Sequence, residues 1–282
     1  MLCDIFQYGS NGLCGIECTS GTRHVSIVFI HGLTEGFLQP AYVRPLAECL
    51  GQSGFRFFQP LLRSSYSGWG KASLDDDAAD LKDFINHIRQ DRGATRIFLI
   101  GHSTGCQDIV HFLKACKIDD IMAVILQGAV SDREAFDVIC KGDKEMMELR
   151  HRMREEAVTM APSEFLPREA ARLVREGDAL IAQRFLSLDG NRTLDDMFSS
   201  DLPDEYMKQR FANILVPVLI VQSLKDEYLP SHANAAELGS RIGRNFPNGR
   251  CICLDGDHAL NGQHETFLAA VRDFVERVVL FS

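Results

Sequence analysis

The sequence predicts an α/β fold in which a mostly parallel, doubly wound sheet carries a helical insertion. Apolar runs of strand length alternate with amphipathic stretches of helical spacing. The later runs are continuously apolar, which is typical of strands buried on both faces of a parallel sheet. The alternation breaks between Val130 and Asn213, where no strand is evident. Strand–helix–strand order of this kind favours right-handed βαβ units.

The segments of strand length begin near the N-terminus and continue to the last quarter of the chain. The first two are less apolar than the others and could form an antiparallel hairpin at the sheet edge. The predicted strands are Asp4–Tyr8, Ile16–Thr19, Val25–Ile30, Arg56–Gln59, Arg96–Ile100, Ile121–Gln127, Val218–Gln222 and Cys251–Leu254.

Helices are predicted between the strands and within the insertion. Leu74–Gln90 has apolar residues at a spacing of 3.6 type, and Ser73 stands three residues before Asp76 as an N-cap signal. The other predicted helices are Thr104–Cys116, Ser231–Ile242 and Glu265–Val279 in the core, and Lys144–Thr159, Pro167–Arg175 and Asp178–Phe185 in the insertion.

The strand-free stretch divides the chain into two parts. Residues 1–130 and 214–282 are interpreted as the core, and residues 131–213 as a helical cap. An insertion between two core strands lies at the carboxyl edge of the sheet, where open α/β sheets bind ligands. We therefore expect a cap over the active site, with an insertion remote from the chemistry as the alternative.

Composition limits the function classes. The chain has 282 residues, which fits one large α/β domain with an insertion. Its net charge of −9 gives no electrostatic basis for binding nucleic acid. No uncharged apolar stretch is long enough for a membrane span, and the N-terminal residues lack a signal-peptide pattern. A monomer or weak homodimer is the default expectation.

The nine cysteines are irregularly spaced. An odd number of cysteines is a poor disulfide framework, so reduced thiols and a cytoplasmic location are expected. Neither Cys14 with Cys18 nor Cys251 with Cys253 has the spacing and partners of a zinc site, so no metal is expected.

The strongest functional motif is GHSTG, from Gly101 to Gly105. The predicted strand Arg96–Ile100 leads into it, and a predicted helix follows. This context makes G-x-S-x-G the nucleophile elbow of the α/β-hydrolase fold, with Ser103 as the nucleophile. Side chains at the two glycine positions would clash with the neighbouring strand or helix.

A serine nucleophile needs a base and an orienting acid, which follow in the order serine, acid, histidine in this fold. His258 lies in a loop between the last strand and the last helix and is the predicted base, with His264 as the alternative. Asp226 follows the strand Val218–Gln222 and is the predicted acid. Glu227 and Asp132 remain alternatives for the acid.

An oxyanion hole needs two backbone N–H donors. We expect one from Thr104, directly after the nucleophile, and one from Leu33, in the loop after the strand Val25–Ile30. Gly32 lets this loop turn toward the site and is expected to contact substrate. His31 is interpreted as a residue that orients the loop. His102 is expected to pack or to face the cap.

A second loop, Arg63–Gly70, also follows a predicted strand at its carboxyl end. Ser65, Tyr66 and Trp69 in this loop are predicted to contact substrate. A glycine-rich surface loop without such contacts is an equal alternative.

Several stretches together resemble one group of proteins, a largely uncharacterised α/β-hydrolase family of fungi, plants and protists that includes fungal esterases opening fusarinine-type siderophores. The resemblance spans most of the chain, from Ile27 to His258. It rests on FIHGLTEGF, QPLLRSSYSGWG, GHSTGCQD, VSDREA, RFLSL and DDMFSSDL.

This resemblance implies an esterase with Ser103, Asp226 and His258 as its triad. His31 stands where many relatives are expected to have glycine, which makes this loop similar to that of general HG-type esterases. The sequence thus predicts hydrolysis of a small-molecule ester through an acyl-enzyme, without a metal or organic cofactor. An acyltransferase or thioesterase with the same triad, and a non-catalytic ligand-binding protein, are the alternatives.

Overall fold

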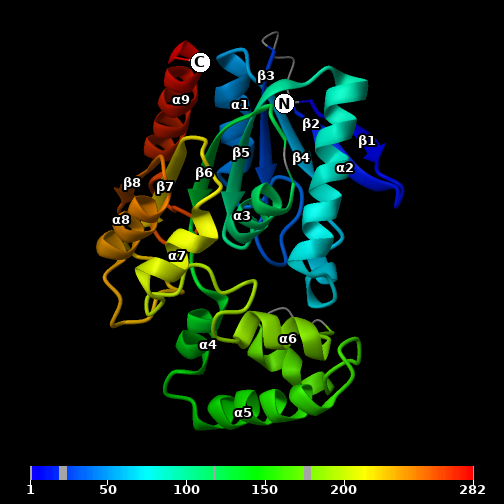
Figure 1. Ribbon diagram of the computed structural model, residues 1–282, viewed down its shortest axis with the longest axis vertical. Coiled ribbons are helices and arrows are strands. Elements are labelled where there is room, and N and C mark those ends of the chain that lie inside the picture. The colour runs from blue at the N-terminus through cyan, green and yellow to red at the C-terminus, as the bar shows by residue number, and fades with distance from the viewer. Residues whose placement is uncertain (1, 19–23, 117, 175–178, 282) are drawn as a thin grey trace.

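A computed structural model describes residues 2–18, 24–116, 118–174 and 179–281. Within these ranges eight strands form one sheet in the order β1-β2-β4-β3-β5-β6-β7-β8 (Figure 1). The hairpin of β1 and β2 is antiparallel and β2 pairs antiparallel with β4, whereas the remaining pairs are parallel. The strands are β1 (Asp4–Tyr8), β2 (Leu13–Glu17), β3 (Val25–Ile30), β4 (Arg56–Pro60), β5 (Thr95–His102), β6 (Ile121–Gln127), β7 (Val218–Ser223) and β8 (Gly249–Leu254).

This sheet confirms the predicted α/β-hydrolase fold, and the edge hairpin also forms as expected. Helices cover both faces: α2, α3 and α8 pack into one apolar cluster with the sheet, and α1 and α9 into another. Their bounds are α1 (Val43–Gln52), α2 (Leu74–Arg92), α3 (Gly105–Ala115), α8 (Ala235–Asn245) and α9 (His264–Phe281). None of the helices within the described ranges has the length and apolarity to cross a membrane.

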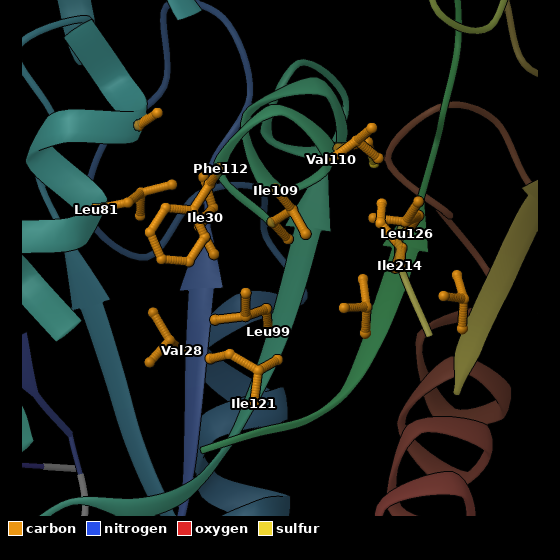
Figure 2. Packing of buried hydrophobic residues seen from close by; sticks show 14 of the residues in the cluster. Val28, Ile30, Leu81, Leu99, Ile109, Val110, Phe112, Ile121, Leu126 and Ile214 are labelled. Carbon is orange, nitrogen blue, oxygen red and sulfur yellow. The ribbon is translucent and has the colours of Figure 1, made fainter. Parts of the chain in front are cut away.

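The central strands are buried because both faces of the sheet are covered. Every residue of β3 is buried, as the continuous apolar run predicts. On one face, Leu81 of α2 and Ile109 and Phe112 of α3 lie against Val28 of β3 and Leu99 of β5 (Figure 2). This packing fixes α3, and with it the turn that precedes α3, at the carboxyl edge of the sheet.

Helix α2 begins as its sequence predicts. The Ser73 hydroxyl accepts a hydrogen bond from the Asp76 N–H, and the Asp76 carboxylate accepts one from the Ser73 N–H. This reciprocal capping box satisfies two N–H groups that the first turn would otherwise leave free. The helix ends at Gly93, whose φ of 62° is the left-handed conformation that glycine adopts readily.

The insertion is helical. Helices α4 (Asp132–Cys140), α5 (Lys144–Thr159) and α6 (Ala182–Asp189) lie together beyond the carboxyl edge of the sheet (Figure 1). Helix α7 (Asp204–Phe211) instead lies beside α8 and packs into the apolar cluster of the core. The division of the chain at residues 131 and 213 stays a prediction.

Two of the three helices predicted in the insertion differ from those observed. Lys144–Thr159 is confirmed as α5, whereas Pro167–Arg175 contains only a short 3₁₀ helix, Arg168–Leu173. The predicted helix Asp178–Phe185 begins instead at Ala182 and continues to Asp189. Residues 175 and 178, at the ends of these two predictions, lie outside the described residues.

The expectation that the cysteines are all reduced is wrong for one pair. Cys3 and Cys18 form a disulfide. In the β1–β2 hairpin Asp4 pairs with Glu17, so the next residues outward, Cys3 and Cys18, lie opposite each other. The spacing of the cysteines hid this pairing because it follows from hairpin register. The argument from reduced thiols for a cytoplasmic location is therefore removed.

The hairpin is held to α2 by the ring of Phe84, which is fully buried between Phe6 and Tyr8. A Cβ on Gly15 of β2 would lie 2.6 Å from this ring, so the fit is close.

Phe84→Ala should therefore lower the free energy of unfolding by about 3–5 kcal/mol, because it removes a fully buried aromatic ring and leaves a cavity. Urea denaturation measures the change. Phe281→Ala, at a residue that is 90% exposed, is the control and should change stability by no more than about 0.5 kcal/mol. Equal effects of the two substitutions would contradict this account of the hairpin.

Candidate active site

The turn between β5 and α3 places Ser103 at the carboxyl edge of the sheet. Its φ is 52°, a left-handed conformation that is uncommon for a residue with a side chain. The Ser103 N–H donates to the carbonyl of Gln127 at 3.0 Å, and its own carbonyl accepts from the Cys106 N–H at 2.9 Å. These bonds hold the strained backbone in place and leave the serine side chain half-buried at the wall of a pocket.

Glycines make this turn possible because there is no space for a Cβ. A Cβ on Gly101 would lie 2.6 Å from the carbonyl oxygen of Gly105, and one on Gly105 would lie 2.4 Å from that of Ile30. Across the turn, a Cβ on Gly32 would lie 2.8 Å from that of Ser103. The loop after β3 therefore packs directly against the serine.

His258 and Asp226 come from the loops after β8 and β7, and both are buried. His258 Nδ1 and Asp226 Oδ2 are 2.8 Å apart. A carboxylate only accepts, so Nδ1 carries the proton and the lone pair is on Nε2. The other carboxylate oxygen of Asp226 accepts the Tyr228 N–H at 3.1 Å, which fixes the carboxylate plane.

The surroundings of His258 change its proton affinity. Burial of the ring lowers its pKa, but the hydrogen bond and charge of Asp226 outweigh this effect, with added support from Glu227 and Glu35. The net result raises the pKa of His258 above its usual value. The ring also meets Tyr228 edge to face, at 4.8 Å between centroids, and lies 4.9 Å from the ring of His102.

The alternative acids and base do not contact the His258 ring as Asp226 does. Asp132 accepts a hydrogen bond from Gln107 Nε2 at 2.9 Å, and burial raises its pKa to about 7. Glu227 accepts the backbone N–H of His258, at 2.9 Å, and not its ring. His264 approaches the carbonyl of Ala259 at 3.2 Å at the start of α9 and does not line the pocket. Asp226 is thus the carboxylate bonded to the His258 ring.

The oxyanion candidates flank Ser103. Within the described part of the chain, the N–H groups of Leu33 and Thr104 make no hydrogen bond. The Gly32 N–H is different, because it donates to Glu35 Oε2 at 2.8 Å. Ser103 and His258 line the same pocket, although no hydrogen bond joins their side chains among the residues described. Such bonds are often long without substrate.

The pocket beside Ser103 is small, with a volume of about 230 Å³. Helix α4 contributes Ala135, Phe136 and Ile139 to its wall and α6 contributes Leu188, all apolar, whereas Asp132 at the start of α4 brings a carboxyl group. This volume suits a small ligand or one group of a larger one. The lining residues are Gly32, Leu33, Thr34, Glu35, His102, Ser103, Val130, Asp132, Ala135, Phe136, Ile139, Val174, Leu188, Tyr228 and His258.

The predicted substrate contacts of the loop Arg63–Gly70 stay a prediction, and none of the described residues of this loop lines the pocket beside Ser103. Tyr66 is half-exposed, and its hydroxyl accepts the Phe37 N–H at 3.3 Å. Trp69 is fully buried in the apolar cluster of the insertion, and its carbonyl accepts from Arg184 Nε at 3.2 Å. Trp69 therefore joins the insertion to the core, whereas Tyr66 packs against the loop after β3. Gly32 lines the pocket, and its contact with substrate stays a prediction.

Ser65 is the remaining member of that loop and binds His31. The His31 ring donates from Nδ1 to the carbonyl of Gly32 at 2.9 Å, so its Nε2 accepts from the Ser65 hydroxyl at 2.6 Å. Burial lowers the pKa of His31, which keeps the ring neutral. His31 therefore orients the loop after β3, as the sequence analysis expects.

Two residues outside the predicted set bring polar groups to the site. Gln127, at the carboxyl end of β6, accepts from His102 Nδ1 and from the Tyr42 hydroxyl, both at 2.6 Å, and donates to the carbonyl of His258 at 2.9 Å. Glu35 lines the pocket beside His102. In the sheet Gln127 pairs with His102, next to Ser103 in the chain, and its sequence signal was a polar residue ending an apolar strand.

Residues 6–280 match the family described as protein of unknown function DUF1749. The chain belongs to this family. It is 30% identical to UPF0613 protein PB24D3.06c of Schizosaccharomyces pombe, over 82% of this chain and 77% of that one. It is also 30% identical to fusarinine C esterase sidJ of Aspergillus fumigatus, over 74% and 72% of the two chains.

The solved structures agree on the fold. The siderophore hydrolase EstB from Aspergillus fumigatus superposes with a TM-score of 0.84 at 25% identity, covering 99% of this chain and 98% of that one. An α/β-hydrolase-fold protein of unknown function superposes with a TM-score of 0.72 at 18% identity, covering 100% and 97%. The expected resemblance is confirmed for fungal relatives. Its esterase relatives and its α/β-hydrolase neighbours support a hydrolase acting on esters.

Proposed function

We propose that this chain cleaves a small carboxylic ester through an acyl-enzyme, with Ser103 as nucleophile, His258 as general base and Asp226 as the acid that orients it. The main support is the 2.8 Å contact between His258 Nδ1 and Asp226. His258 lines the same pocket as Ser103, whose φ is 52°. A serine hydroxyl is a weak nucleophile until a positioned base removes its proton. The position of His258 in the same pocket as Ser103 supports its assignment as this base.

In the proposed reaction Ser103 Oγ attacks the ester carbonyl while its proton passes to His258 Nε2. The tetrahedral intermediate then expels the alkoxide, which takes the proton from the imidazolium. Water repeats the sequence on the acyl-enzyme, releasing the acid and restoring the serine. Asp226 keeps the proton on Nδ1 and stabilises the charged ring.

The negative oxygen of the intermediate is assigned to the N–H groups of Leu33 and Thr104. Both donors are unoccupied within the described residues, and the contact of Gly32 with Ser103 brings the Leu33 loop to the serine. Gly32 itself is excluded as a donor, since its N–H already binds Glu35. Fixed donors of this kind stabilise charge that develops in the transition state.

The nucleophile is tested by covalent labelling. A fluorophosphonate probe should label the wild-type protein at Ser103, shown by mass spectrometry of the modified peptide. Ser103→Ala should abolish labelling and lower ester turnover by a factor that can approach about 10⁶. A folded wild-type protein that takes no label, or a variant with near wild-type turnover, would refute the assignment.

The acid is tested by a matched pair of substitutions. Asp226→Asn should lower kcat by about 10⁴, because an amide in place of the carboxylate favours the wrong imidazole tautomer. Asp132→Asn removes the other candidate carboxylate and should cost far less, since Asp132 binds Gln107 and not His258. Steady-state kinetics on one ester compares them, and a larger loss for Asp132→Asn would overturn the choice of acid.

The base is tested by the pH profile. Attack requires neutral His258, and Asp226 raises the pKa of that ring. Activity should therefore fall as the pH decreases, with an apparent pKa of kcat/KM above the ordinary histidine value of about 6.5. An acid limb well below that value would mean that His258 is not the titrating base.

A further inference from the structure

Two hydrogen-bond acceptors converge in the pocket without a donor between them. Glu35 Oε1 and His102 Nε2 are 3.5 Å apart, and both residues line the pocket beside Ser103. Neither residue belongs to the proposed triad or oxyanion hole. The question is which of them carries a proton.

The tautomer of His102 follows from Gln127. The Gln127 amide nitrogen donates to the carbonyl of His258, so the oxygen of the same amide faces His102 Nδ1 at 2.6 Å. That oxygen only accepts, so Nδ1 must carry the proton. Burial lowers the pKa of His102 to about 4, which leaves Nε2 as a bare lone pair at neutral pH.

Glu35 presents the second acceptor. Its Oε2 accepts the Gly32 N–H at 2.8 Å, and its Oε1 faces the lone pair of His102. The His102 side chain is only 3% exposed and that of Glu35 is 20% exposed, so water screens this pair poorly. Two acceptors at this distance repel each other, and a donor that binds both would remove this cost.

We propose that this acceptor pair binds a protonated primary amine of the substrate, so that the pocket selects amino esters; the inference rests on the proposed esterase function. An ammonium group has three N–H donors and no acceptor, which suits one carboxylate oxygen and one imidazole nitrogen. A hydroxyl has one donor and no charge. The described lining contains no lysine or arginine to compete for Glu35. Its other carboxylate, Asp132 at the start of α4, is hydrogen-bonded to Gln107, and the remaining lining side chains of α4 and α6 are apolar.

The position of Glu35 limits the distance between the amine and the ester. A Cβ built on Gly32 would lie 2.8 Å from the Cβ of Ser103 and 3.2 Å from Glu35 Oε2. The carboxylate and the nucleophile are thus near neighbours, because both lie next to the same point beside the Gly32 Cα. The amine must lie only a few bonds from the carbonyl that Ser103 attacks, so the substrate class is a short-spaced amino ester.

Two pairs of esters test this selectivity from either side of the ester bond. The phenyl ester of 3-aminopropanoic acid is compared with phenyl butanoate, and 2-aminoethyl acetate with propyl acetate, since a methyl group replaces the ammonium in each pair. Glu35→Gln keeps an acceptor for the Gly32 N–H but removes the charge. In at least one pair, Glu35→Gln should lower kcat/KM for the amino ester about tenfold more than for the uncharged ester. This is the loss expected for a charge-assisted hydrogen bond.

The ratio of kcat/KM for the amino ester to that for its partner is compared between the wild-type protein and each variant. The different intrinsic reactivities of the two esters cancel in this comparison. Glu35→Asp keeps the charge and should restore part of the selectivity. Glu237→Gln removes one charge from an exposed glutamate of α8, outside the pocket lining, and should leave the ratio unchanged. Equal losses for both members of both pairs would overturn the proposal and would indicate that only water occupies the acceptor pair.

Binding to Ser103→Ala protein separates this inference from the proposed function. By calorimetry, 3-aminopropanamide should bind about tenfold more tightly than butanamide, which has a methyl group in place of the ammonium. Equal affinities would overturn the amine site even if esters are hydrolysed. A third outcome separates the two proposals. If the variant binds the amine more tightly but the wild-type protein neither hydrolyses esters nor takes the fluorophosphonate label, the amine site is supported and the esterase mechanism is rejected.

Discussion

The close approach of α3 to the end of β3 is the constraint on which the rest of the site depends. Ile30 pairs with Gly101 in the sheet. Gly105 lies so close to the end of β3 that a Cβ on it would be only 2.4 Å from the carbonyl oxygen of Ile30. This contact forces a sharp turn between β5 and α3, so Ser103 takes a φ of 52°. Strain of this kind persists only where surrounding packing determines it. Here the apolar side chains of α3 hold the helix against β3 and β5 (Figure 2).

Gln127 links the Ser103 turn to the loop of His258 through hydrogen bonds. It is fully buried, its carbonyl fixes the Ser103 N–H, and its side chain binds His102, Tyr42 and the backbone of His258. One residue at the end of β6 therefore connects the elbow with the loop that carries the proposed base. A buried amide with its donor and acceptor both used rigidifies its surroundings, because any rotation would leave polar groups unpaired.

Features set by local sequence were predictable, and those set by register or three-dimensional proximity were not. The strand Val25–Ile30 and the capped start of α2 follow from apolar runs and a capping box. The Cys3–Cys18 disulfide depends on hairpin register, and the role of Trp69 depends on the packing of the insertion. Helix α1 could have been found from its buried Val43, Leu46, Ala47 and Leu50, which have helical spacing, but it has no side-chain cap to mark its start. Glu35 and His102 lie beside predicted residues, yet only the fold shows that their acceptors meet.

The charges around His258 have opposite effects on the two ions formed in the proposed reaction. Asp226, Glu227 and Glu35 all favour the imidazolium. Glu35 also lies on the oxyanion loop, bonded to Gly32, where its negative charge opposes the developing oxyanion. An ammonium bound at Glu35 would neutralise this opposition while leaving Asp226 to stabilise the ring. A substrate that carries the amine would then supply part of the transition-state stabilisation itself, because its charge matters most when the oxyanion forms. On this argument selectivity should arise in kcat as well as in KM.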